Sequence, residues 1–92
     1  MGYLSCEHSQ AVKDAAIELA RARKKFGRFH SAHEGYAVIL EELDELWREV
    51  QSKGRTVESM RGEAIQVAAM AIRFVEDLCA TSTLTASEGE PK

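Results

Sequence analysis

The chain has 92 residues, enough for one domain but too few for a second hydrophobic core. Its 15 acidic residues outnumber 12 lysines and arginines, and this net charge of −3 argues against the basic surface of a nucleic-acid-binding domain. No segment approaches the ~20 apolar residues of a membrane span, and no signal-like start is present. We therefore expect a soluble, cytoplasmic protein with neither nucleic-acid nor membrane partners.

The first predicted helix spans residues 5–25, with Ser5 or Ser9 as its N-cap. It ends in a basic cluster just before Gly27. Cations suit this position, because the unpaired carbonyl groups at a helix C-terminus carry partial negative charge. The basic cluster consists of Arg21, Arg23, Lys24 and Lys25.

The second predicted helix spans residues 31–52 and is strongly amphipathic. Its apolar sector includes Tyr36 and Trp47, which we expect to pack in the core. Its other face is almost purely acidic. The acidic residues on that face are Glu34, Glu41, Glu42, Glu45 and Glu49.

The third predicted helix spans residues 57–79, with Thr56 as its N-cap. It is apolar over most of its circumference, so burial on several sides, and hence a homodimer or homotetramer, is expected. Its narrow polar strip consists of Gln66, Arg73, Glu76 and Asp77. The sequence thus predicts an all-α fold: one domain at residues 1–80, made of three main helices and completed by oligomerisation, followed by a disordered tail at residues 81–92.

Three carboxylates are candidates for a metal site. Glu42 and Glu45 are three residues apart and share one helix face. Glu63 lies on the apolar side of the third helix, where a carboxylate is either paired or bound to something. The short connection predicts antiparallel helices, so Glu63 can face the other two. Spacing alone leaves open a merely solvated acidic surface and a site for Mg²⁺ or Mn²⁺.

The acidic motif has a family likeness. The sequence E-x-x-E at residues 42–45, followed by E-x-x-Q at residues 63–66, resembles the MazG-like all-α nucleoside triphosphate pyrophosphatases, whose signature is E-x-x-E and then E-x-x-D. The segment FGRFHSAHEGYAVILEELDELWREV, residues 26–50, is similar to a MazG-like subgroup. The resemblance covers about residues 26–78. It implies a dimer or tetramer that hydrolyses a nucleoside or deoxynucleoside triphosphate to the monophosphate and pyrophosphate with Mg²⁺, in a house-cleaning role.

The resemblance also implies roles for individual residues. Metal ligands would be Glu42, Glu45 and Glu63, with Gln66 completing the shell. Beyond the resemblance itself, we expect either of two neighbouring carboxylates, Glu41 and Glu49, to orient or deprotonate the attacking water. Gln66 stands where the family has Asp, which removes one negative charge. This departure leaves two possibilities: an enzyme with an altered metal shell, or a degenerate relative that binds nucleotide or a protein partner without hydrolysis.

Substrate contacts are sought outside the acidic motif. The basic cluster, together with Arg28, could bind the triphosphate, and Lys24 and Arg28 are the best candidates; the alternative is a solvated helix end. Phe26 and Phe29 could both stack on the base, as could Tyr36 and Trp47, and Phe29, in the linker before the second helix, is the best candidate. His33 would line the pocket or cap the helix. Glu34 lies two turns before the E-x-x-E motif and would reach only the edge of the site.

Overall fold

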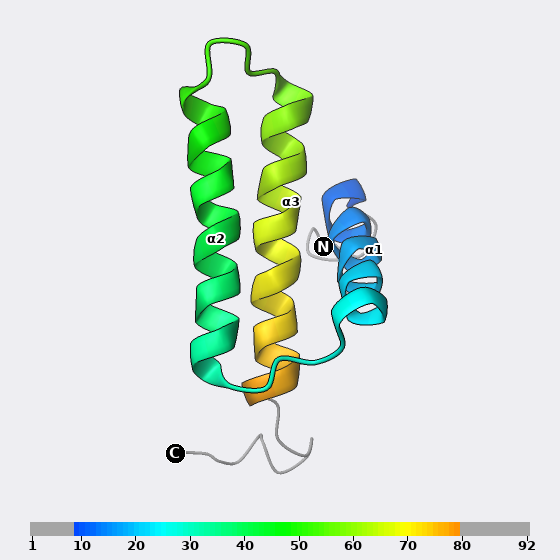
Figure 1. Ribbon diagram of the computed structural model, residues 1–92. Coiled ribbons are helices and arrows are strands. Elements are labelled where there is room, and N and C mark those ends of the chain that lie inside the picture. The colour runs from blue at the N-terminus through cyan, green and yellow to red at the C-terminus, as the bar shows by residue number, and fades with distance from the viewer. Residues whose placement is uncertain (1–8, 80–92) are drawn as a thin grey trace.

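The computed structural model describes residues 9–79, which form three helices (Figure 1). These are α1 (Gln10–Phe26), α2 (Ala32–Gln51) and α3 (Val57–Phe74), and α3 continues into a π-helical turn, η2 (Val75–Cys79). The predicted all-α fold is confirmed for the described residues. The predicted tail at 81–92 and the predicted helix start at residue 5 lie outside them.

Local capping signals set the helix boundaries. The Ser9 hydroxyl accepts a backbone hydrogen bond in the first turn of α1 at 3.3 Å. Gly27 ends this helix with a φ of 77°, and its N–H donates to the carbonyl of Arg23 at 2.9 Å. Ser31 caps α2, and Thr56 caps α3 through a capping box. Each helix therefore begins or ends where a cap residue offers the backbone a partner.

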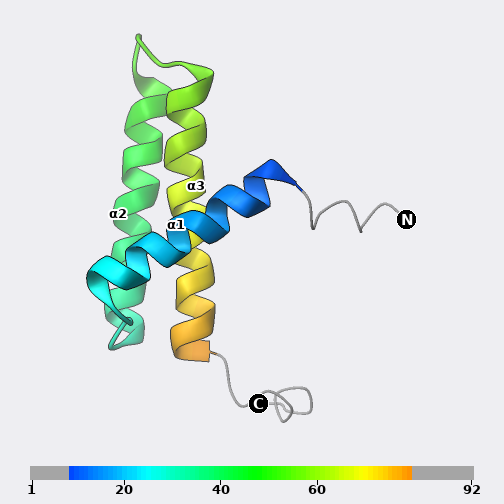
Figure 2. The same cartoon turned by 90° about the vertical axis from the view of Figure 1, so that its right-hand side faces the viewer.

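Helices α2 and α3 run antiparallel, and α1 crosses this hairpin obliquely, packing mainly against α3 (Figures 1 and 2). Gly35 lets the start of α2 approach the end of α3 closely. A Cβ atom on Gly35 would lie 2.6 Å from Cδ2 of Phe74, which is closer than real Cβ contacts allow. The close approach of α2 and α3 at this point therefore requires glycine at position 35.

The core is small and lies between α1, the linker at 27–31 and the hairpin. Its buried residues are Ala22, Phe29, Ala69 and Met70, and the partly buried Leu19, Val38, Ile39, Phe74 and Leu78 pack against them. No helix within residues 9–79 has the length and apolar character needed to cross a lipid bilayer.

The predicted polar strip of α3 is wrong at two positions. Arg73 is only 4% exposed, and its guanidinium donates to the carbonyl of Gly27 at 3.0 Å and lies 3.9 Å from the ring centroid of Phe29. The Asp77 side chain is 3% exposed and accepts hydrogen bonds from the N–H of Phe29 at 2.9 Å and from Arg23 at 2.6 Å. The linker between α1 and α2 crosses this end of α3 (Figure 1), and Gly27 and Phe29 of the linker form the hydrogen bonds to Arg73 and Asp77.

The expected core packing of Tyr36 and Trp47 is also wrong for the single chain. These side chains are 63% and 58% exposed, and Leu40 and Leu43 between them are 41% and 47% exposed. The four residues recur at helical spacing, so they form one band along α2, here called the α2 apolar stripe. Helix α2 instead turns the other edge of its apolar sector, including Ile39, towards the core.

Candidate metal centre

Three carboxylates converge between α2 and α3. Glu42 and Glu45 from α2 and Glu63 from α3 each offer an oxygen atom within 4.8 Å of the other two. All three side chains are half-buried. The predicted convergence is confirmed, while binding of a metal ion stays a prediction. We call these residues the acidic triad.

The acidic triad carries uncompensated negative charge. Burial raises the pKa of Glu42, and the charges of Glu45, Glu63, Glu41 and Glu18 raise it further. The ionised form of Glu42 is therefore disfavoured where it stands. A cation placed among the three oxygens would reverse that effect, and carboxylates are the donors that Mg²⁺ and Mn²⁺ prefer.

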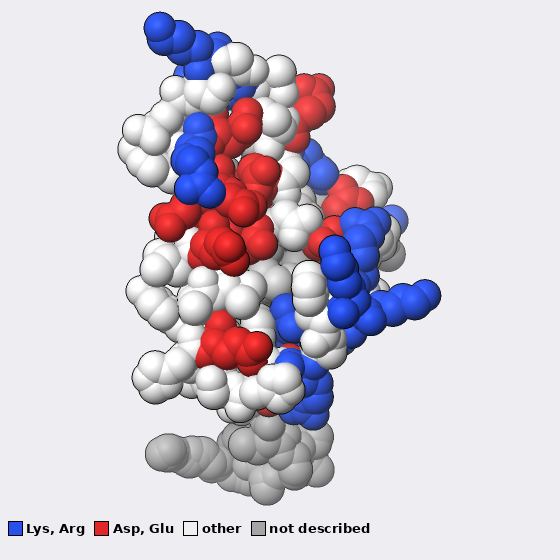
Figure 3. Space-filling model, in the orientation of Figure 1, with Lys and Arg blue, Asp and Glu red and all other residues white. Residues whose placement is uncertain are grey.

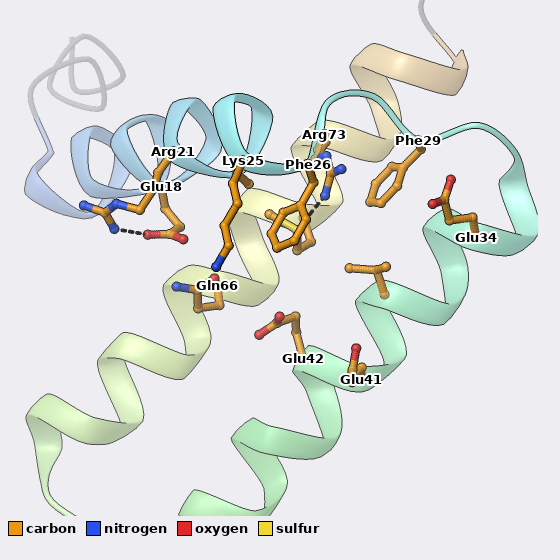
Figure 4. A pocket seen from close by; sticks show the side chains of 13 residues that line it. Glu18, Arg21, Lys25, Phe26, Phe29, Glu34, Glu41, Glu42, Gln66 and Arg73 are labelled. Atoms are coloured by element: carbon orange, nitrogen blue, oxygen red, sulfur yellow. Dashed lines mark hydrogen bonds and ion pairs between the residues drawn. The ribbon is translucent and has the colours of Figure 1, made fainter.

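A cleft of about 480 Å³ opens beside the acidic triad, lined by all three helices and by Phe29 of the linker (Figure 4). Its lining residues are Glu18, Arg21, Ala22, Lys25, Phe26, Phe29, Glu34, Val38, Glu41, Glu42, Gln66, Met70 and Arg73. Glu42 belongs to both the triad and the cleft. A ligand in the cleft would therefore reach the acidic triad.

The two sides of the cleft differ in charge. Helix α2 contributes Glu34, Glu41 and Glu42, whereas α1 contributes the cation Lys25 and the ion pair of Arg21 with Glu18 (Figure 4). The same division is visible on the surface, where acidic side chains gather over the middle of the α2–α3 hairpin and basic ones over α1 (Figure 3). Such a cleft offers acceptors for a metal ion on one side and donors for an anion on the other.

Several residues expected from the sequence do line the cleft. Gln66 lies one turn after Glu63 on α3 and borders the acidic triad. Glu41 lies beside the triad, whereas Glu34 lies at the other end and accepts the backbone N–H of His30 at 2.5 Å. Phe29 lines the cleft too, but it is only 4% exposed and its ring packs against Arg73 and Phe74. It forms a wall of the cleft and offers little free surface for stacking.

Four expected residues lie outside both the cleft and the acidic triad. Lys24 is exposed outside it, and Arg28 instead donates to the backbone carbonyl of Asp77 at 2.9 Å. His33 lines a separate shallow hollow near the start of α2. Glu49 accepts a hydrogen bond from the hydroxyl of a capping-box serine of α3. The rotation of each helix about its own axis sets these positions for the three helical residues, whereas Arg28 lies in the linker.

Sequence reasoning preferred Lys24 to Arg21 and Lys25 within the basic cluster, and Phe29 to Phe26, although Arg21, Lys25 and Phe26 all line the cleft. A signal existed, since the buried Ala22 marks the inner face of α1. Lys25 and Phe26 follow Ala22 by three and four residues and therefore share that face. Lys24 lies about 100° away from Lys25 around the helix.

No family model, curated protein or solved structure matches the chain. The likeness to the MazG-like family thus stays a sequence-based prediction.

Proposed function

We propose that the protein is a Mg²⁺-dependent nucleoside triphosphate pyrophosphohydrolase, which splits a nucleotide into its monophosphate and pyrophosphate. The observation that carries the proposal is the convergence of Glu42, Glu45 and Glu63 at the edge of a cleft that also contains cations. A nucleoside triphosphate has the matching parts: a metal-binding phosphate chain and a flat base. The sequence motif places the same three carboxylates as ligands in the MazG-like family.

The donor set of the acidic triad fits a hard divalent cation. The three carboxylates supply oxygen ligands, and the negative charges of Glu45 and Glu63 help to raise the pKa of Glu42. A cation among them would relieve this repulsion. Mg²⁺ or Mn²⁺ held there supplies charge neutralisation for phosphate oxygens and makes a coordinated water more acidic. Gln66 offers a neutral amide oxygen beside the triad and completes the donor set without adding charge.

Two further cleft residues receive roles in this proposal. Glu41 lies beside the acidic triad and has no hydrogen-bond partner within residues 9–79, so its carboxylate is free to orient the attacking water and accept its proton. Glu49 is engaged by Ser59, which favours Glu41 for this role. Phe26 lines the cleft and is 63% exposed, so its ring offers a better stacking surface for a base than that of Phe29.

The proposal includes a homodimer. The α2 apolar stripe exposes four large side chains in a row, from Tyr36 to Trp47. Contiguous apolar surface of this kind typically marks an interaction site. A second copy that packs its own stripe against this one would bury both in a symmetric interface. The MazG-like resemblance implies the same arrangement.

The deciding experiment measures pyrophosphate release from a panel of ribonucleoside and deoxyribonucleoside triphosphates with Mg²⁺, with Mn²⁺ and with a chelator. We expect release that needs the metal and that Glu45→Ala abolishes. Asp44→Asn is the matched control, because Asp44 is an exposed acid on the same helix outside the triad. The preferred nucleotide in the panel would define the substrate class.

The alternative function is nucleotide binding without hydrolysis. Gln66 favours it, because a neutral amide stands beside the triad where the related motif has a carboxylate. In that case the folded protein would release no pyrophosphate from any nucleotide. It would still bind a non-hydrolysable triphosphate analogue in a Mn²⁺-dependent manner, and Glu45→Ala would weaken that binding. Absence of both release and binding would overturn both functions.

A further inference from the structure

The basic cluster at the end of α1 contains one cation that faces the cleft without a carboxylate partner. Arg21 is paired with Glu18, and Arg23 with Glu76 and Asp77. Lys24 does not line the cleft. The remaining member, Lys25, lines the cleft and forms no ion pair within 4.0 Å in the described part of the chain. Its charge is therefore available to a ligand.

Neighbouring groups define the position of the Lys25 side chain. Its Nζ lies 5.2 Å from the ring centroid of Phe26, a distance at which the ring attracts an ammonium group. Figure 4 shows the side chain extending from α1 across the cleft towards Gln66, on the side where Glu42 lies. The ammonium group thus lies between the aromatic side chain and the edge of the acidic triad. A phosphate chain that reached the triad would pass close to it.

The charges around the triad leave room for one divalent cation and one monovalent cation. The three carboxylates carry three negative charges, and one divalent cation leaves a net charge of minus one. Gln66 adds no charge to this site. A second divalent cation would give the three triad carboxylates and their cations a net charge of plus one, whereas Lys25 brings that set to neutrality. Neutrality matters because a highly charged phosphate chain is repelled by an anionic site.

We propose that Lys25 binds the phosphate chain of the ligand and supplies the positive charge that a second metal ion supplies in two-metal phosphate sites. One divalent cation on the acidic triad and the Lys25 ammonium then hold the phosphates from two sides. A lysine ammonium suits this task, since it is a compact charge with three donors. This inference rests on the proposed function for its metal site, but it concerns phosphate binding and not hydrolysis.

The test measures binding of Mn²⁺ alone and of inorganic tripolyphosphate in saturating Mn²⁺, using the full chain. We expect the wild-type chain to bind one Mn²⁺. Lys25→Gln should keep that single ion with equal or higher affinity, because a nearby positive charge is removed. It should bind tripolyphosphate about tenfold more weakly, the loss expected for one charge-assisted contact. Lys24→Gln, the adjacent exposed lysine, is the matched control and should bind both as the wild type does.

A rescue variant tests the exchange of a lysine for a metal. Gln66→Asp combined with Lys25→Gln gives the site a fourth carboxylate and removes the ammonium group. We expect this double variant to take up a second Mn²⁺ and to recover the tripolyphosphate affinity lost in Lys25→Gln. Circular dichroism confirms that each variant keeps its helices.

Three results would overturn the inference: two Mn²⁺ ions on the wild-type chain, unweakened tripolyphosphate binding by Lys25→Gln, or a double variant that recovers nothing. Failure of the proposed function looks different. A wild-type chain that binds one Mn²⁺ and tripolyphosphate through Lys25, yet releases no pyrophosphate from any nucleotide, would support the inference and remove the hydrolysis.

Discussion

Replacing Glu63 by Gln should stabilise the protein when no divalent cation is present, because it removes one charge from the acidic triad. The three oxygens lie within 4.8 Å of one another, and two unit charges at that distance repel by about 0.9 kcal/mol in water and about 3.5 kcal/mol at an effective dielectric constant of 20. Half-exposed groups belong near the lower figure. Since Glu63 faces two partners, the expected gain is about 1–2 kcal/mol.

Thermal unfolding at one fixed protein concentration measures this gain. In chelator, the Tm of Glu63→Gln should exceed that of the wild type by roughly 5–10 °C, because 1 kcal/mol moves the Tm of a domain this small by about 4–8 °C. In saturating Mg²⁺ the order should reverse. The wild type gains about 2.7 kcal/mol when the cation is at 100 times its Kd, while the variant has lost a ligand. Asp44→Asn removes an exposed charge outside the triad and should leave the Mg²⁺ response unchanged.

Two results would refute this reasoning separately. A Tm of Glu63→Gln below that of the wild type in chelator would show that Glu63 is stabilising in the free protein and that repulsion does not dominate. An equal rise with Mg²⁺ in both proteins would show that the cation binds away from the acidic triad. The glutamine keeps the shape and nearly the helix propensity of glutamate, so neither result can be assigned to a packing defect.

Gly35→Ala should destabilise the protein by about 1–2 kcal/mol in urea unfolding, because the new Cβ would lie 2.6 Å from the Phe74 ring. This clash should outweigh the higher helix propensity of alanine. Unchanged stability would mean that the Phe74 ring moves aside freely. For Asp77, burial raises the pKa, but hydrogen bonds from Phe29 and Arg23 and the charges of the arginines outweigh it and hold the pKa below its ordinary 3.8. The contribution of the Asp77 carboxylate to the stability of the fold is therefore fully present above pH 3.8 and is lost as the pH falls through the lowered pKa of the folded state. Asp77→Asn should lower the free energy of unfolding by about 2 kcal/mol at neutral pH. In unfolding experiments at different pH values, the variant should also lack this loss of stability in acid. Trp47→Glu should turn a dimer into a folded monomer in sedimentation, and a dimer that persists would place the interface elsewhere.

The sequence predicted those parts of the fold that local chemistry decides. Ser9, one of the two expected N-caps of the first helix, and Thr56 cap the helices that they were expected to cap. Gly27 ends α1 as expected, because a cap acts within one helical turn. The burial of Arg73 and Asp77 could not be found in this way. It depends on a linker some 45 residues away in the chain that crosses the end of α3, and helical periodicity contains no information about that crossing.

In the candidate site, too, some residues could be placed from local spacing and others could not. Glu42 and Glu45 share a helix face by their spacing, and the short connection forces Glu63 into the facing helix, so the acidic triad could be predicted. The sequence could not show which cations line the cleft. Lys24 and Lys25 are neighbours in sequence, and only the rotation of α1 against the hairpin decides which one lines the cleft.

The rotation of α2 about its axis accounts for two unfavourable features of the single chain, the crowded carboxylates of the acidic triad and the exposed α2 apolar stripe. This helix presents its acidic edge, with Glu42 and Glu45, to α3 and leaves the α2 apolar stripe outside. In an isolated chain both choices are unfavourable, since one crowds negative charge and the other exposes apolar surface to water. Turning α2 to bury Trp47 would separate the carboxylates from Glu63. A cation among the carboxylates and a second copy over the stripe, both proposed above, would each make this orientation more favourable. Metal binding and dimerisation should therefore favour the same rotation of α2 and strengthen each other.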